Sequence, residues 1–263
     1  MATTTKKEAH ISHSQITEFT RCPRKYHLHY RVGLLAVFCP SGLLFGSAVH
    51  EAVALFNQGR LEGKKPSPEE LLAAYRACWE KERLPVRLRS RESPASFEAT
   101  ARRLLELCAS EQGRSGEVVA VEEPFSIRLS ERTPEVKGVI DLVERARDGT
   151  LIVTDYKTSS SRSEPEADQL VLYREALLKT GFAAGCVVHA RYVLLVKGAE
   201  PEIILRNVKI GQSDGERLRR LYEAVWRDIK LGCSFPIPGW WCADCQWQRH
   251  CDQAQDQTER RGR

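Results

Sequence analysis

The stretch from residue 136 to residue 157 constrains the fold of this chain more than any other. Two runs rich in β-branched and other apolar residues, 136–145 and 151–157, flank an Asp148-Gly149 turn signal. Such a pair of runs around a short turn predicts an antiparallel β-hairpin. We therefore expect a sheet built around this hairpin.

Three charged residues in the hairpin suit metal-assisted hydrolysis. Asp141 lies in the first run, and Asp155 and Lys157 lie near the end of the second. Side chains alternate faces with a period of two, so Asp155 and Lys157 share one face of their strand. Two carboxylates can hold a hard divalent cation, and a lysine beside them can orient a water or stabilise charge on a phosphate.

The length of the turn decides whether the two carboxylates face each other. A two-residue turn would place Asp141 opposite Tyr156, on the wrong face. A three-residue loop, 147–149, with Gly149 in a left-handed bulge, places Asp141 opposite Asp155. We predict the three-residue loop, because the chemistry of a shared metal site and the placement of the glycine both favour it. The alternative to a metal site is a solvated hairpin with scattered charges. Against that alternative, Asp155 follows an apolar run, and aspartate is disfavoured in a strand and costly to bury without a partner.

At this point the sequence resembles a known family. Gly-Val-Ile-Asp at 138–141, followed by Asp-Tyr-Lys-Thr at 155–158, resembles the core of the PD-(D/E)XK nucleases. The most similar branch is the RecB-like group, which includes the nuclease domain of bacterial recombination helicase-nucleases and the CRISPR-associated exonucleases. The resemblance implies an α/β, restriction-endonuclease-like fold, with a mixed central β-sheet flanked by helices, a helical insertion and a C-terminal iron–sulfur staple. Ile140 replaces the proline of the family's name.

Two predicted helices carry further candidate residues. His50 lies in the helix 42–57, and Gln169 and Tyr173 lie four residues apart, on one face of the helix 164–180. Taken alone, His50 is typical of a core histidine, and the other pair fits an ordinary amphipathic helix. The resemblance implies that His50 is a metal ligand and that Gln169 and Tyr173 contact DNA.

Three cysteines near the end of the chain have the spacing of metal ligands. Cys242, Cys245 and Cys251 lie among three tryptophans, and thiolates bind both zinc and iron–sulfur clusters. A zinc site could recruit His250. The resemblance supports Cys22 instead, in a Cys-Pro-Arg-Lys-Tyr string, as the fourth ligand of a [4Fe–4S] cluster. The other five of the nine cysteines fit as small core residues.

Composition sets wider limits. The net charge of +5 permits nucleic-acid binding without requiring it. No apolar run is long enough to span a membrane, no secretory signal opens the chain and no Gly-rich loop ending in Gly-Lys-Ser/Thr appears, so we expect a cytoplasmic protein without an ATP site. Arg87, Arg89 and Arg91 fit either solvated charge or a DNA-backbone patch.

The remaining elements suit a mixed sheet with helices against it. We expect one nuclease domain over residues 12–251, with a helical insertion at 58–115, a cysteine segment at 233–251 joined to Cys22, and disordered tails at 1–11 and 252–263. The further predicted helices are 14–21, 23–30, 68–83, 94–111 and 213–231, and the further strands are 117–129, 186–196 and 202–208. Glu122 and Glu123 interrupt the strand 117–129, and neither is assigned a role.

These observations lead to one leading hypothesis and two alternatives. The leading hypothesis is a Mg²⁺- or Mn²⁺-dependent DNA nuclease, an exonuclease on single-stranded or end-containing DNA in repair, recombination or CRISPR adaptation. Asp141, Asp155, His50 and the carbonyl of Tyr156 would hold the metal, and Lys157 would position the attacking water. Its partners would be DNA, with a helicase or CRISPR adaptation proteins as further candidates. The alternatives are a non-catalytic iron–sulfur DNA-binding module and a zinc-stabilised hydrolase of another substrate.

Overall fold

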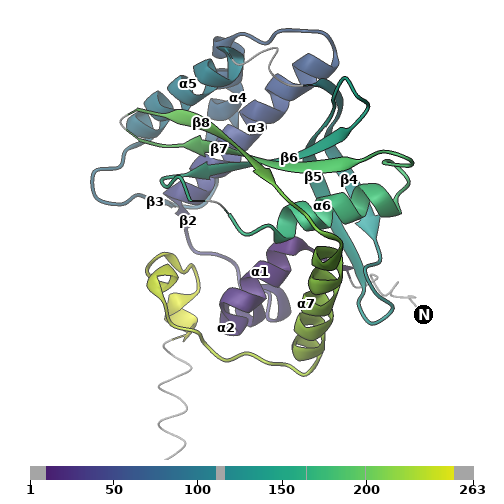
Figure 1. Cartoon of the computed structure of the whole chain (residues 1–263). Helices are drawn as coiled ribbons and strands as arrows, with labels where there is room; N and C mark the ends of the chain where they lie inside the picture. The colour runs from purple at the N-terminus through teal and green to yellow at the C-terminus, as the bar shows by residue number, and fades with distance from the viewer. Residues whose placement is uncertain (1–9, 111–115, 164, 199, 252–263) are drawn as a thin grey trace, which may run out of the picture.

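The computed structural model describes residues 10–110, 116–163, 165–198 and 200–251. A mixed six-stranded sheet forms the centre, in the order β1-β5-β6-β7-β8, with β4 paired to the other edge of β5 (Figure 1). The strands are β1 (His10–Ile11), β4 (Glu117–Ile127), β5 (Glu135–Arg145), β6 (Leu151–Ser159), β7 (Val188–Val196) and β8 (Glu202–Val208). Neighbouring strands are antiparallel except for the pairs β1–β5 and β6–β7.

Helices cover both faces of the sheet. They are α1 (His13–Arg21), α2 (Pro23–Tyr26), α3 (Ser41–Leu61), α4 (Pro68–Lys81), α5 (Pro94–Ser110), α6 (Asp168–Lys179) and α7 (Gln212–Lys230). The alternation of β7 explains the two layers. Tyr192 and Leu194 pack into a core with α1, α6 and α7, whereas Val193 and Leu195 pack into a second core with α3, α4 and α5. This is the expected mixed sheet flanked by helices.

The predicted hairpin register is confirmed. Leu142 pairs with Thr154, so the next antiparallel step places Asp141 opposite Asp155. The amide of Gly149 donates to the carbonyl of Ala146 at 3.0 Å, and Gly149 has φ +84°, where a side chain would be strained. The left-handed glycine closes the three-residue loop and fixes which carboxylates face each other.

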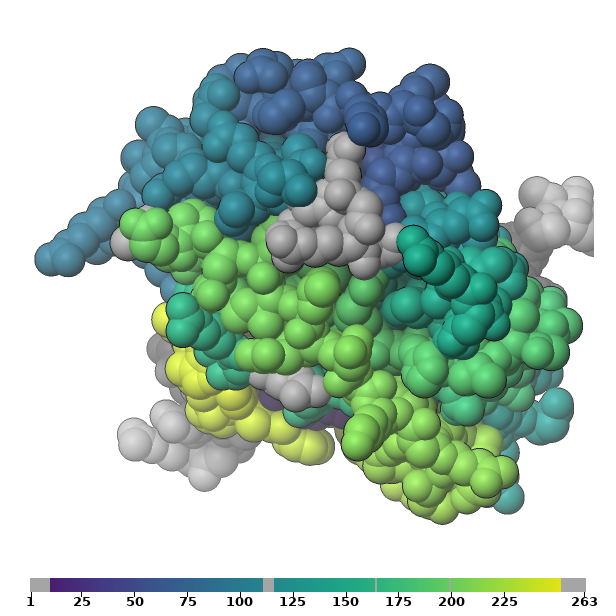
Figure 2. Space-filling view, turned by 45° about the horizontal axis from the view of Figure 1, so that its top comes forward, coloured from purple at the N-terminus to yellow at the C-terminus, as the bar shows by residue number. Residues whose placement is uncertain are grey.

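Residues 58–110 add two helices to one face of the sheet. Figure 2 shows these helices, in blue, stacked directly against the light-green strands β7 and β8. Ser67 caps α4 in a capping box with Glu70, and Pro68 occupies its first turn. Buried Tyr75, Phe97 and Leu104 join these helices to α3 and β7, so this segment helps to fix α3 on the sheet.

Several boundaries differ from the sequence prediction. Residues 10 and 11 are not part of a disordered tail but pair with β5 as β1, because Ile11 enters the core. The helix after Pro23 changes at residue 27 to a π-helix, His27–Arg31. Helix α6 begins at Asp168 and strand β7 at Val188, later than expected. The remaining predicted tail residues, 1–9 and 252–263, lie outside the described residues.

The sequence did not predict a small parallel pair, β2 (Cys39–Pro40) with β3 (Val86–Arg87). Each strand has two residues, too short for an alternating pattern to be visible in the sequence. Among the described helices, none is both long and apolar enough to cross a membrane.

Candidate active site

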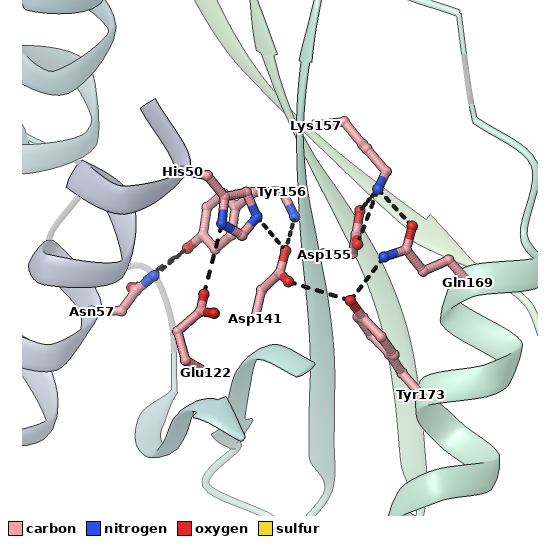
Figure 3. Close-up of polar contacts among 9 residues, drawn as sticks. All are labelled: His50, Asn57, Glu122, Asp141, Asp155, Tyr156, Lys157, Gln169 and Tyr173. Atoms are coloured by element: carbon pink, nitrogen blue, oxygen red, sulfur yellow. Dashed lines mark hydrogen bonds and ion pairs between the residues drawn. The ribbon is translucent and has the colours of Figure 1, made fainter. Parts of the chain in front are cut away.

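The site lies where β5 and β6 separate. Beyond the pair Leu142–Thr154, the backbone amide of Tyr156 donates to Oδ2 of Asp141 at 2.9 Å (Figure 3). A side-chain carboxylate thus takes the place that a backbone carbonyl would occupy in a continuing ladder. This arrangement holds Asp141, 7% exposed, at the point where the strands diverge.

Helix α3 brings His50 to this carboxylate. The apolar side of α3, including Val49 and Val53, packs into the second core and sets the helix against the sheet. His50 Nε2 lies 2.8 Å from Asp141 Oδ2. Burial lowers the pKa of His50, but the hydrogen bond and charge of Asp141, with nearby Glu122 and Asp155, outweigh burial and raise it. The imidazole therefore lies among carboxylates and faces them.

Glu122 completes a three-residue group that the sequence prediction did not assign. Its Oε1 lies 3.7 Å from His50 Nδ1, and one ligand atom each of His50, Glu122 and Asp141 lie within 4.8 Å of one another. Glu122 has φ +48°, a left-handed conformation that is costly for a residue with a side chain and is concentrated at functional sites. In the sequence, only the pair of glutamates at 122 and 123 indicated an acidic residue at this position.

Asp155 and Lys157 form the second half of the site. Lys157 Nζ lies 2.8 Å from Asp155 Oδ2 and 3.2 Å from Oδ1, and Asp155 is 1% exposed. The buried Oδ2 makes this ion pair but has no aligned hydrogen-bond donor in the described part of the chain. Burial raises the pKa of Asp155 to about 6, Lys157 opposes that shift, and Asp141 adds to it. A buried carboxylate whose Oδ2 has an ion pair but no aligned hydrogen bond is able to bind a cation.

Helix α6 connects the two halves through Gln169 and Tyr173. Lys157 Nζ donates to Gln169 Oε1 at 2.7 Å, and the Gln169 amide donates to the hydroxyl of Tyr173 at 2.8 Å. That hydroxyl donates in turn to Asp141 Oδ1 at 3.3 Å (Figure 3). Tyr173 is only 4% exposed, so its hydroxyl is directed at the carboxylate of Asp141 rather than at solvent. Contact of the two residues with DNA stays a prediction.

A buried polar network fixes α3 against the sheet behind the site. Arg60 of α3 donates to the carboxylate of Glu144 on β5 at 2.6 Å, and Arg191 of β7 pairs with the other oxygen of Glu144. One turn earlier, Asn57 donates to the hydroxyl of Tyr156 at 3.1 Å. Glu144 is fully buried, and a buried charge is tolerated only with such partners. The network sets the distance between His50 and the strands.

A groove of about 930 Å³ opens onto the site. Its walls come from α1, α3, β4 and β6, and they include Ser14, Gly46, His50, Glu122, Tyr156 and Lys157. Gly46 faces Thr158 closely, since an added Cβ would lie 3.1 Å from the threonine hydroxyl. The groove gives an extended substrate access to the carboxylates.

The four predicted cluster cysteines line one cavity of about 360 Å³. Cys22 lies between α1 and α2, whereas Cys242, Cys245 and Cys251 lie in the C-terminal segment, drawn in yellow beside these helices (Figure 1). Burial raises the pKa of Cys245, and nearby Cys22 and Cys242 add to that rise. Residues 220 positions apart therefore meet in the fold.

Two of the three arginines of the basic loop have partners within the chain. Arg87 donates to the carbonyl of Ala243 at 3.3 Å and stacks on Phe38, and Arg89 pairs with Asp244. The side chains of these two residues join the loop to the cysteine segment. The contacts favour a structural role for Arg87 and Arg89.

The fold and this arrangement of residues correspond to a known class of enzymes. The sequence model of the PD-(D/E)XK nuclease superfamily matches residues 10–252, and the chain belongs to that superfamily. The crystal structure of a candidate exonuclease from Eubacterium rectale is similar, with a TM-score of 0.58 at 15% identity, over 92% of this chain and 87% of that chain. The crystal structure of SSO0001 aligns with a TM-score of 0.37 at 17% identity, over 88% of this chain and 93% of that chain. No curated protein matches.

Proposed function

We propose that this protein is a Mg²⁺- or Mn²⁺-dependent deoxyribonuclease of the RecB-like branch. We further propose that it acts as an exonuclease on single-stranded or end-containing DNA. The observation that carries this proposal is the meeting of Asp141, His50 and Glu122 with the Asp155–Lys157 pair where β5 and β6 separate. Carboxylates and one neutral imidazole form a donor set that suits Mn²⁺. Mg²⁺ also binds the carboxylates but accepts the imidazole nitrogen less readily.

The residues would divide the work as follows. Asp141, His50, Asp155 and Glu122 would hold the cation. The carbonyl of Tyr156 points to the same side of its strand as the amide that bonds Asp141, and is a further candidate ligand. A bound divalent cation supplies Lewis acidity and lowers the pKa of water.

Lys157 would position the attacking water and stabilise charge on the scissile phosphate. Its ammonium is held between Asp155 and Gln169, which keeps it directed at the site. In an in-line attack, the water oxygen bonds to phosphorus while the leaving oxygen departs, and the water proton passes to solvent. Tyr173 would keep Asp141 in its orientation through its hydroxyl.

We also propose that Cys22, Cys242, Cys245 and Cys251 hold a [4Fe–4S] cluster. All four line one cavity. Four thiolates brought together from the two ends of the chain match the four-cysteine ligand set of such a cluster, as the family resemblance implies. Anaerobic purification should give a brown protein with iron and sulfide and no stoichiometric zinc.

A substrate panel tests the proposed activity. Wild-type protein would be incubated with end-labelled single-stranded DNA, blunt duplex, circular single-stranded DNA and RNA, each with Mn²⁺, Mg²⁺ or EDTA. We expect DNA cleavage with the metals, none with EDTA, and protection of the circular DNA. Cleavage that persists in EDTA, or none on any DNA with either metal, would contradict the proposal.

A further inference from the structure

Three cavities form one continuous track on the surface. The groove at the active site and a second cavity of about 530 Å³ share Ser14 and Lys157. That second cavity and the cysteine cavity share Arg21 and Lys25. The adjoining cavities offer a route by which a flexible chain in the active site could reach the rim of the cysteine cavity.

One face of α1 forms the floor of the track. Ser14, Thr17 and Arg21 have the i, i+3, i+7 spacing of a single helix face, and all three line the second cavity. Ile16 and Phe19, on the opposite face, are buried and anchor the helix. Seven residues of α-helix measure about 10 Å, which is at most about three nucleotides, given the rise of about 3.4 Å per nucleotide of a stacked strand.

The charges of this face leave Arg21 available. Glu18 is held by Lys25 and His29, each at 2.9 Å, so its carboxylate is already paired. Asp168, across the cavity, is held by Arg217 at 2.6 Å, and the exposed Glu166 is a further carboxylate on that wall. Arg21 is exposed, and its guanidinium has no ion-pair partner among the described residues. A free guanidinium on a track that leads from a phosphodiester site suits a phosphate group.

An exposed indole marks the far end of the track. Trp240 is 78% exposed and lines the cysteine cavity together with Arg21. Its neighbours differ, since Trp241 donates to the carbonyl of Ile237 and Trp247 is 2% exposed. The ring of Trp240 packs edge-on against Trp241, with centroids 5.8 Å apart, and is otherwise left open on a cavity that Arg21 also lines. Burying a tryptophan is favourable, so such an exposed indole suits an aromatic ligand that stacks.

We propose that a single strand of DNA leaves the active site along α1, places a phosphate on Arg21 and stacks a base on Trp240. This inference rests on the proposed nuclease function. It specifies a substrate strand whose bases are unpaired from the scissile phosphate out to about the fourth nucleotide. A duplex in the same position would keep its bases stacked internally and could not use the indole.

Length-dependent binding tests the track. Affinities of a 3-mer and a 12-mer of single-stranded DNA would be measured by fluorescence anisotropy, in an Asp155→Asn background that prevents cleavage. Trp240→Ala should weaken binding of the 12-mer about ten-fold, the range of one lost base stack, and leave the 3-mer unchanged. Trp240→Phe should restore most of the affinity. Arg21→Ala should weaken the 12-mer and lower the slope of log affinity against log salt by about 0.7.

Two matched variants serve as controls. Phe235→Ala removes an exposed aromatic ring outside the cavity, and Arg220→Ala removes an exposed guanidinium on α7. Both should bind like the parent. Iron content and melting curves of each variant establish that the cysteine cavity is intact. If Trp240→Ala loses iron, the affinity and salt dependence of Arg21→Ala decide the result.

The outcomes separate the track from the nuclease itself. If wild-type protein cleaves DNA but both Arg21→Ala and Trp240→Ala bind the 12-mer normally, the proposed track is wrong and the proposed nuclease function is unaffected. Equal losses for the 3-mer and the 12-mer would also overturn the track. If wild-type protein neither binds nor cleaves DNA, the proposed function itself fails.

Discussion

The carboxylate site and the cysteine cavity are built in different ways. In the carboxylate site, Asp141 accepts hydrogen bonds from a backbone amide, His50 and Tyr173, all within one sheet-and-helix frame. In the cysteine cavity, a single helix boundary meets a C-terminal segment whose regular structure is a 3₁₀ turn, Trp240–Asp244, and the short helical stretch 248–251. The first site is held by the core, so it should persist without metal. The second should depend on the proposed cofactor for stability, and the predictions test this contrast.

The largest expected effect falls on catalysis when Asp141 is changed. Asp141→Asn keeps the shape but removes the charge at the centre of the ligand group, so cleavage should fall about a thousand-fold or more. The melting temperature should hardly change, since the core holds this site. Kinetics and thermal melts of Asp141→Asn would be compared with Glu123→Gln, a neighbour of Glu122 that should keep its activity. A large loss of melting temperature in Asp141→Asn would contradict the claim that the core, and not the charge of Asp141, holds the carboxylate site together.

The cysteine cavity should show the opposite pattern, with stability most affected. A cofactor bound through Cys22 and the C-terminal cysteines closes a long loop, a constraint of about 5 kcal/mol by analogy with a disulfide. Cys245→Ser should therefore lower the melting temperature by about 10 °C and release iron. Cys186→Ser, outside the cavity, should shift it by about 2 °C or less. Equal melting temperatures for the two variants would show that the cavity needs no cofactor.

The pH dependence sharpens the picture of the carboxylate site. The folded protein raises the pKa of Asp155 to about 6 from an ordinary value of 3.8, chiefly through burial. The folded state therefore binds the Asp155 proton more tightly than the unfolded chain does. The stability gained from that protonation is fully present below about pH 4 and is lost as the pH rises through 6. Without metal, Asp155→Asn should thus melt about 5 °C higher than wild type at pH 7.5, with no advantage at pH 4.

Metal binding should depend on pH in the opposite sense. Asp155 must lose its proton to bind a cation, and so must His50, whose pKa is raised by Asp141 despite burial. Calorimetric Mn²⁺ affinity should rise between pH 5.5 and pH 7.5, with protons released on binding. Affinity that is flat across this interval would place the cation elsewhere.

The smallest effect concerns Tyr173. Tyr173→Phe removes the hydroxyl that donates to Asp141 and accepts from Gln169. Loss of one such hydrogen bond should slow cleavage about ten-fold and leave DNA affinity unchanged. A loss of affinity without a change in the cleavage step would instead assign Tyr173 to DNA contact, as the sequence resemblance implied.

The parts that the sequence could predict are those that follow from local rules. The period of two, a glycine that can adopt positive φ and the need of two carboxylates to share a metal together predicted Asp141 opposite Asp155. The apolar positions of α3 placed His50 on a helix. These features depend on residues close together in the chain, so their pattern is visible before the fold is known.

The parts that the sequence could not predict depend on irregular backbone or distant partners. Glu122 reaches the site through a left-handed residue within a strand, which no alternation pattern reveals. Glu144 meets Arg60 and Arg191 across three elements. In the sequence, nothing indicates that Arg89 pairs with the distant Asp244, which the fold brings beside it.

The most direct test of the central claim is cleavage of a labelled single-stranded oligonucleotide by wild type and Asp155→Asn at equal concentration, with Mn²⁺ at pH 7.5. We predict rapid cleavage by wild type, and loss of cleavage by Asp155→Asn with DNA binding retained and a melting temperature at least as high. Equal cleavage by the two proteins would contradict the assignment of the site.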